Sequence, residues 1–179
     1  TSEYDDSEWE FAKPYINVEI HQAVSPGNLR ERTIPYMYRK DCCFTEIMEV
    51  SKSVHSQEKW QEFIEGKGVL EIPSDTEEII EISAGEELTG YISLALSAGK
   101  NAEITLTYAE AYVQEEQVGP DHVALKKDRL DQKNGHLEGY QDHYCTAGLG
   151  TEITPEIYEP FWFRTFRFIR VEVEAETEL

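Results

Sequence analysis

Apolar and polar residues alternate with a period of two in the second half of the chain, which predicts β-strands. In the segment 102–108 every second residue is apolar, as in a strand with one buried face. The segment 91–96 alternates in the same way, and the four residues 98–101 separate the two. We therefore expect these segments to form a β-hairpin. The segments 69–72 and 80–82 are shorter strand candidates.

The run 161–175 gives the strongest strand signal, but its register changes part-way. Ile169 and Val173 fall on one face of the run, whereas Phe166 and Phe168 have the opposite parity. Either both faces of the first half are covered by other parts of the protein, or a β-bulge near Phe168 resets the register. We expect cover on both faces.

A single segment has helical spacing. Trp60, Phe63 and Ile64 lie at positions i, i+3 and i+4, which places them on one side of a helix. Ser56 precedes them as a candidate N-cap, and Gly66 follows as a typical C-terminal stop. The sequence therefore predicts one short helix here.

Many short strands and one helix predict an all-β fold, an antiparallel β-sandwich or jelly roll. We expect a single domain over residues 1–179, with an extended N-terminal segment of about residues 1–40. Residues 114–150 are polar and show little periodicity, so we expect a long insertion there. Such an insertion is a usual place to contact a ligand or a neighbouring domain, although a solvated loop fits the pattern equally well.

The charge of the chain excludes one class of partner. Among 179 residues there are 16 Lys and Arg against 36 Asp and Glu, a formal net charge of −20. Because nucleic acid is bound largely through basic side chains, we expect no nucleic-acid partner. No apolar run is long enough to cross a bilayer, so we expect no membrane partner either.

The three cysteines are Cys42, Cys43 and Cys145, and their spacing matches no zinc or disulfide motif. We interpret them as small buried or half-exposed thiols. A disulfide from Cys145 to Cys42 or Cys43 is the alternative and would suit a secreted protein. The sequence leaves the compartment open, with secretion slightly favoured.

No strong catalytic signature is present, so the chemical candidates are weak ones. Asp128, Asp131 and Asn134 recur at every third position and offer the hard oxygen ligands that calcium prefers. Their spacing differs from that of a calcium loop, and a polar turn explains it as well. We therefore assign no cofactor and keep calcium as a weak alternative.

The tripeptide Asp142-His143-Tyr144 and the residue Trp162 are candidates for binding a sugar. Carboxylates accept hydrogen bonds from sugar hydroxyls, and aromatic rings stack on sugar C–H faces. Three consecutive strand residues cannot all face one way, so an ordinary mixture of core and surface residues is the alternative. Trp162 can equally anchor the core or an interdomain contact.

Two further sets of charged residues need an explanation. Glu110 and Glu159 lie near apolar strands and form a conceivable glycosidase pair, though 36 acidic residues make such pairs common. Three arginines lie three residues apart in the C-terminal run, and we expect them to pair with nearby glutamates such as Glu159, Glu172 or Glu103; they are Arg164, Arg167 and Arg170.

The run Ile157–Val173 contains a recognisable phrase, Tyr-Glu-Pro-Phe-Trp-Phe-Arg-Thr-Phe-Arg-Phe. It resembles the element that precedes the catalytic domain of bacterial and fungal α-L-rhamnosidases. Less specific matches follow the order of that family along the rest of the chain: Trp9-x-x-Ala12, Leu29-x-x-Arg32-x-x-Pro35, Gly90-Tyr91-Ile92, Tyr108-Ala109-Glu110, Asp142-x-Tyr144 and Gly148-x-Gly150-x-Glu152.

The resemblance implies a β-sandwich accessory domain that is not catalytic by itself. In the family, an (α/α)6 barrel that would follow Leu179 cleaves terminal α-L-rhamnose by an inverting, metal-independent mechanism. We therefore expect that barrel and rhamnose-containing glycans as partners, and assign no catalytic residue here. Phe161, Trp162 and Arg164 are the expected interdomain contacts.

Two alternatives remain at this point. The first is a free-standing carbohydrate-binding sandwich that uses Asp142, His143, Tyr144 and Trp162. The second is a complete small jelly-roll enzyme that relies on an acidic residue such as Glu110 or Glu159.

Overall fold

The structure is a computed structural model that describes residues 5–11 and 31–179. Contacts divide the chain into two units, Thr1–Asp41 and Cys42–Leu179. Within the first unit the described residues contain no helix or strand, and their side chains are exposed. Ala12 and Leu29, which belong to the family resemblance, lie outside the described residues. The second unit carries all the elements described below.

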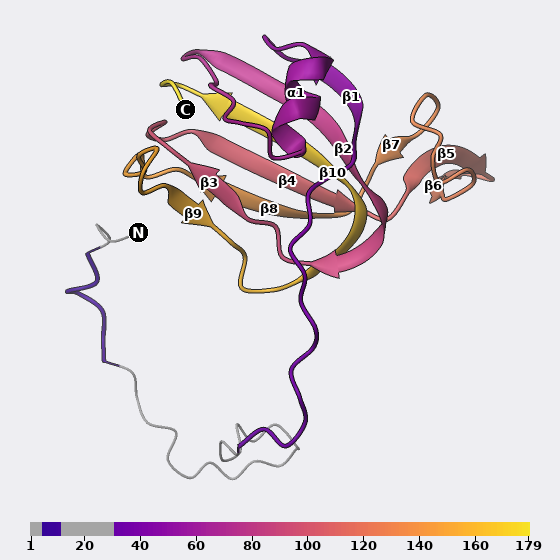
Figure 1. The fold of residues 1–179 in the computed structure, drawn as a ribbon. Helices are drawn as coiled ribbons and strands as arrows, with labels where there is room; N and C mark the ends of the chain where they lie inside the picture. The colour runs from indigo at the N-terminus through magenta and orange to yellow at the C-terminus, as the bar shows by residue number, and fades with distance from the viewer. Residues whose placement is uncertain (1–4, 12–30) are drawn as a thin grey trace. The chain divides into compact units, whose positions relative to one another are not determined.

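A five-stranded antiparallel sheet forms the centre of the second unit, and we call it the main sheet (Figure 1). Its central strand is β10, the run with the strongest strand signal. The spatial order is β1 (Glu46–Lys52), β2 (Thr76–Gly90), β10 (Arg164–Ala175), β4 (Glu103–Ala109) and β8 (Tyr140–Cys145).

Two smaller sheets accompany the main sheet. One pairs β3 (Leu94–Leu96) with β9 (Glu156–Tyr158), and the other has the order β6 (Asp121–Leu125), β5 (Tyr112–Val118), β7 (His136–Leu137). Side chains of β3, β9 and helix α1 (Gln57–Ile64) pack on one face of the main sheet, which we call the inner face. The prediction of an all-β antiparallel sandwich with one short helix is confirmed.

The predicted hairpin between residues 91–96 and 102–108 is wrong. Strand β3 pairs with β9, while β4 lies between β10 and β8. The connection therefore crosses from one sheet to the other, and Ala98, Gly99 and Asn101 have positive φ angles of 60°, 63° and 61° there. Alternation of side chains shows which face of a strand is buried, but it does not identify the neighbouring strand.

The change of register in β10 combines both explanations offered by the sequence. The pairing with β2 shifts between Phe166 and Phe168, so a bulge brings Phe166 into the inner core with Ile169. Phe168 points to the opposite, outer face, where it is fully buried with its ring 5.0 Å from that of Tyr112. The expected two-sided cover is thus correct for Phe168 alone.

The polar segment 114–150, which we expected to be a long insertion, contains several strands. It contains most of β5, all of β6 and β7, and β8, which is an edge strand of the main sheet. Strands β5 and β6 are exposed over most of their length, so they lack the apolar alternation that reveals a half-buried strand. The segment 69–72 forms no strand either, although Ile72 exchanges backbone hydrogen bonds of 2.8 and 2.9 Å with Leu179.

Helix α1 agrees with its prediction from the sequence. Ser56 is the N-cap, and its Oγ accepts a hydrogen bond of 3.3 Å from the Lys59 amide. Trp60 and Ile64 are buried in the inner core, and Gly66 follows the helix with a φ of 74°.

We expect Ser56→Ala to lower the free energy of unfolding by about 1 kcal/mol, because the Lys59 amide loses its side-chain acceptor and keeps only the 3.1 Å bond to the Ser56 carbonyl. Ser56→Gly should lower the free energy of unfolding by only a few tenths of a kcal/mol, since glycine tolerates the cap conformation and leaves the amide open to water. Urea unfolding of both variants checks the cap. An equal cost for the two substitutions would contradict it.

Candidate functional site

The segment between β9 and β10 carries the most exposed aromatic surface near the family phrase. Phe161 is fully exposed, and Trp162 is 65% exposed. The Trp162 ring stacks on Phe163, with ring centroids 5.4 Å apart. We call residues 161–163 the aromatic loop. Large aromatic side chains on a surface usually mark a contact with another molecule or domain.

Arg164, directly after this loop, is held by the main sheet. Its guanidinium forms an ion pair with the Asp142 carboxylate of β8 and lies 5.7 Å from the centre of the Tyr108 ring. The side chains are 24% exposed for Arg164 and 11% for Asp142. A pair so well covered is screened little by water, so it fixes the start of β10 against β8.

Two polar atoms of this ion pair are closed to solvent. Asp142 Oδ2 and Arg164 Nε are both buried and have no hydrogen-bond partner among the described residues. Burial, and then the Asp142 charge, raise the pKa of the Tyr108 hydroxyl, which therefore stays protonated. A ligand from solution cannot reach Asp142 Oδ2 or Arg164 Nε unless side chains move. We therefore assign this ion pair a structural role, which is to position the aromatic loop.

A second anchor lies beside it. The Tyr144 hydroxyl donates a hydrogen bond of 2.5 Å to Glu156, whose carboxylate also accepts from the Ala147 amide at 2.8 Å. Tyr144 packs on Tyr158 with ring centroids 4.7 Å apart. Burial, together with the bond to Glu156, raises the pKa of Tyr144 to about 12. Burial opposes ionisation of Glu156, but these donors hold its pKa below the usual value.

The predicted sugar-binding residues do not form one surface. Asp142 and Tyr144 face inward, whereas His143 faces outward, where its Nδ1 lies 3.0 Å from the Thr105 hydroxyl. The alternation along β8 thus separates three consecutive residues, as their spacing predicts. Trp162 is exposed on the aromatic loop.

The glutamates proposed as a catalytic pair occupy surface positions. Glu110 accepts a hydrogen bond of 2.6 Å from Lys126, which holds the pKa of its carboxyl below the usual value. Glu159 is exposed on the segment after β9. Neither residue is buried in the way that marks a general acid.

Only one of the three C-terminal arginines has a partner that we expected. Arg170 bonds to Glu172 at 3.1 Å, in agreement with the prediction. Arg164 pairs with Asp142, which the local sequence does not suggest because β8 is distant along the chain. The Arg167 guanidinium lies 5.5 Å from the Phe168 ring.

The residues considered for calcium form a polar turn in this structure. Asp131 accepts hydrogen bonds from the Asn134 amide nitrogens and from Gln114, and these bonds lower the pKa of its carboxyl. Asp128 accepts from the Leu130 amide at 3.0 Å. The Asn134 side chain presents its nitrogen to Asp131, so the three residues do not offer a converging set of oxygens. Calcium binding stays a prediction.

The three cysteines, Cys42, Cys43 and Cys145, are exposed free thiols. The disulfide considered from the sequence is therefore not formed in this structure. A carboxylate neighbour, Glu103, is the main cause that raises the pKa of the Cys145 thiol. This makes Cys145 a weaker nucleophile at neutral pH.

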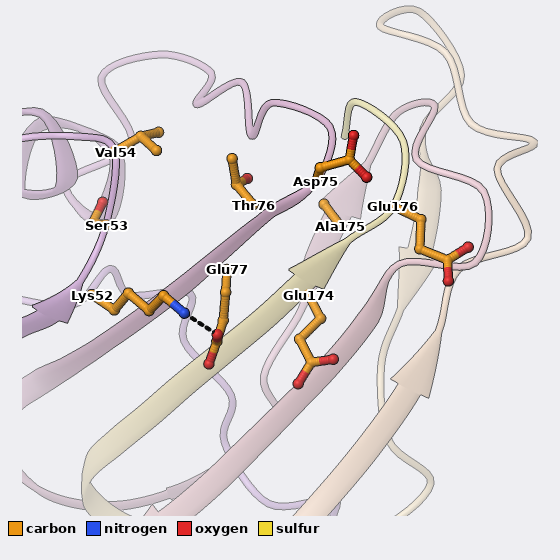
Figure 2. A pocket seen from close by; sticks show the side chains of 9 residues that line it. All are labelled: Lys52, Ser53, Val54, Asp75, Thr76, Glu77, Glu174, Ala175 and Glu176. Carbon is orange, nitrogen blue, oxygen red and sulfur yellow. Dashed lines mark hydrogen bonds and ion pairs between the residues drawn. The ribbon is translucent and has the colours of Figure 1, made fainter.

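An open pocket of about 520 Å³ lies where β1, β2 and β10 approach one end of the main sheet (Figure 2). Lys52 forms an ion pair with Glu77 across it. Three other carboxylates line the pocket, from Asp75, Glu174 and Glu176. Exposed acidic residues alone do not identify a ligand, so we assign the pocket no function.

Residues that could hold a metal lie on β5, on β7 and directly after β7. One ligand atom from each of Glu115, His136 and Glu138 falls within 4.8 Å of the others. All three side chains are exposed, and nothing else among the described residues points to a cation there. We therefore assign no metal to them.

Glu81 is a buried acidic residue that the sequence does not reveal. It is 4% exposed on the outer face of β2, and its Oε2 accepts a hydrogen bond of 2.7 Å from the Tyr112 hydroxyl. Burial raises the pKa of its carboxyl. In the sequence Ile80-Glu81-Ile82, Glu81 has the pattern of a solvent-facing strand residue. Only the fold brings β5 over it.

Comparison with known proteins adds no relative. No protein-family model, no curated protein and no solved structure matches this chain. The resemblance to α-L-rhamnosidases therefore stays a prediction. In the described part of the chain the one helix, α1, has eight residues, and no helix is long and apolar enough to cross a membrane.

Proposed function

We propose that this chain is a non-catalytic β-sandwich accessory module of an α-L-rhamnosidase-like glycoside hydrolase. In this role it packs on the catalytic (α/α)6 barrel of the same parent protein and orients it. The observation that carries the proposal is the aromatic loop, in which Phe161 is fully exposed and Trp162 is 65% exposed. Docking would remove this apolar surface from water.

The surroundings of the loop support docking because they fix its position before any partner arrives. Arg164 follows the loop and is paired with Asp142, while Tyr158 precedes it and packs on Tyr144. These four residues come from two separate parts of the family resemblance, and the fold brings them together. A preorganised loop loses less conformational entropy on association.

The carbohydrate-binding alternative has less support from the geometry. Its one exposed aromatic residue is Trp162, whereas Asp142 is covered by Arg164 and His143 lies on the other face. Calorimetric titration with L-rhamnose, with and without a chelator, separates the two functions. Saturable binding at millimolar or lower concentration would favour the alternative, and no heat is expected for the accessory module.

The decisive experiment measures association with the barrel. The proposal requires that the parent gene encode a helical barrel after Leu179, and a parent without one refutes it. With the two parts expressed separately, we expect a stable complex that Phe161→Ala together with Trp162→Ala weakens by at least about tenfold, since such anchors dominate interfaces. Tyr140→Ala removes another exposed aromatic ring, on β8, and should leave the affinity unchanged.

Residues 1–179 alone should hydrolyse no aryl α-L-rhamnoside. Turnover by the purified chain, lost on Glu110→Gln or Glu159→Gln with the fold intact, would instead support the small-enzyme alternative.

A further inference from the structure

The residues 112–137, with β5, β6 and β7, form an arm at one end of the main sheet (Figure 1). The arm contacts the outer face through a small apolar cluster that is separate from the inner core. Tyr112 and Leu137 enter this cluster from the arm, and Ala109, Phe168 and Met48 enter it from the main sheet. Because this apolar cluster is small, the polar contacts beside it contribute much of the free energy that holds the arm on the main sheet.

One of these polar contacts joins the arm to a buried carboxyl. The Tyr112 hydroxyl of the arm donates a hydrogen bond of 2.7 Å to Glu81 Oε2 of the main sheet. Both residues are buried, at 1% and 4% exposure. Detaching the arm would break this bond and expose the Glu81 carboxyl to water.

Titratable and charged groups face Glu81 from four elements. Glu49 of β1 adds a negative charge, while Arg170 of β10 lies 3.8 Å from Glu81 Oε1 and His136 of β7 is nearby. Burial raises the pKa of Glu81 most, Tyr112 opposes this, Glu49 adds to it, and Arg170 and His136 oppose it. Arg170 also bonds to Glu172, at 3.1 Å.

This sets the direction of the pH dependence. Because the pKa of Glu81 is higher with the arm attached than for a carboxyl in water, attachment takes up a proton. The contribution is fully present below the usual pKa of a glutamate. It is lost as the pH rises through the raised value.

We propose that Glu81 is a proton-operated latch that holds the arm against the main sheet when protonated and loosens it when ionised. The latch is independent of the docking function, since it lies on the outer face. It makes the arm of this chain a pH-sensitive element whose local opening grows towards neutral pH.

Hydrogen exchange on the whole chain between pH 5 and 7.5 tests the latch. After correction for intrinsic exchange, we expect the opening constants of β5 and β7 amides to rise at least about threefold over this range, since one pKa unit corresponds to tenfold. The opening constants of amides in the centre of β10 should not change with pH in this way. The carboxyl carbon of Glu81 should titrate with the same midpoint in NMR spectra.

Glu81→Gln is the matched variant, because glutamine keeps an acceptor for the Tyr112 hydroxyl but cannot ionise. In this variant the opening constants of the arm should not depend on pH. At pH 7.5 the arm should keep the protection from hydrogen exchange that the wild-type arm has at pH 5. Glu174→Gln, an exposed change on β10, should behave like the wild type. A wild-type arm with pH-independent opening, or a Glu81→Gln arm with the wild-type dependence, would overturn the proposal.

Discussion

Phe168→Ala should lower the free energy of unfolding by about 3–5 kcal/mol, the largest single-residue effect that we expect in this chain. Phe168 has no exposed surface, and its ring packs 5.0 Å from that of Tyr112. Truncation leaves a cavity between the arm and the main sheet, and the paired strands on either side limit its collapse. Denaturant unfolding followed by tryptophan fluorescence and by circular dichroism measures the loss.

Phe161→Ala is the matched control, since it makes the same chemical change at a fully exposed position. We expect it to alter the free energy of unfolding by no more than about 0.5 kcal/mol. A comparable loss in both variants would mean that the aromatic loop is part of the core. That result would also remove the basis for docking through Phe161.

Arg164→Ala should lower the free energy of unfolding by about 2–4 kcal/mol, because it leaves the covered carboxylate of Asp142 without its counter-charge. The pair lies between the start of β10 and the edge strand β8, so its loss should also release the aromatic loop. A double-mutant cycle with Asp142→Ala should give a coupling energy of about 1–3 kcal/mol. The double variant should lose less free energy of unfolding than the two single variants lose in sum.

The surface pair of Lys126 and Glu110 provides the comparison for this cycle. Its side chains are 44% and 41% exposed, so its coupling should stay below about 1 kcal/mol. Equal coupling in the two cycles would show that Arg164 and Asp142 are solvated in solution. Their role in positioning the loop would then fail.

The fold class follows from local patterns because each pattern reports a local physical requirement. Period-two alternation in β4 and β10 reflects the apolar face that each strand presents to the inner core, and helical spacing around Trp60 with Ser56 as a cap defines α1. The strands of the arm were missed because β6 and the part of β5 after Val113 contain no buried residue. A strand without a buried face has no reason to alternate.

The candidate site divides in the same way. The sequence singles out Phe161 and Trp162 by residue type, and the structure leaves both side chains exposed. It places Asp142, His143 and Tyr144 together, and the pleat of β8 separates them. The partner of Arg164 could not be predicted, since Asp142 lies 22 residues earlier along the chain.

The sequence by itself determined the all-β class, the position of helix α1 and the strong strand at the C-terminus. Tertiary structure alone decided that β3 pairs with β9, that Arg164 pairs with Asp142 and that Glu81 is buried beneath the arm. The physical reason is that strand pairing is non-local. Periodicity states that a face must be covered, and only the assembled chain determines which residues cover it.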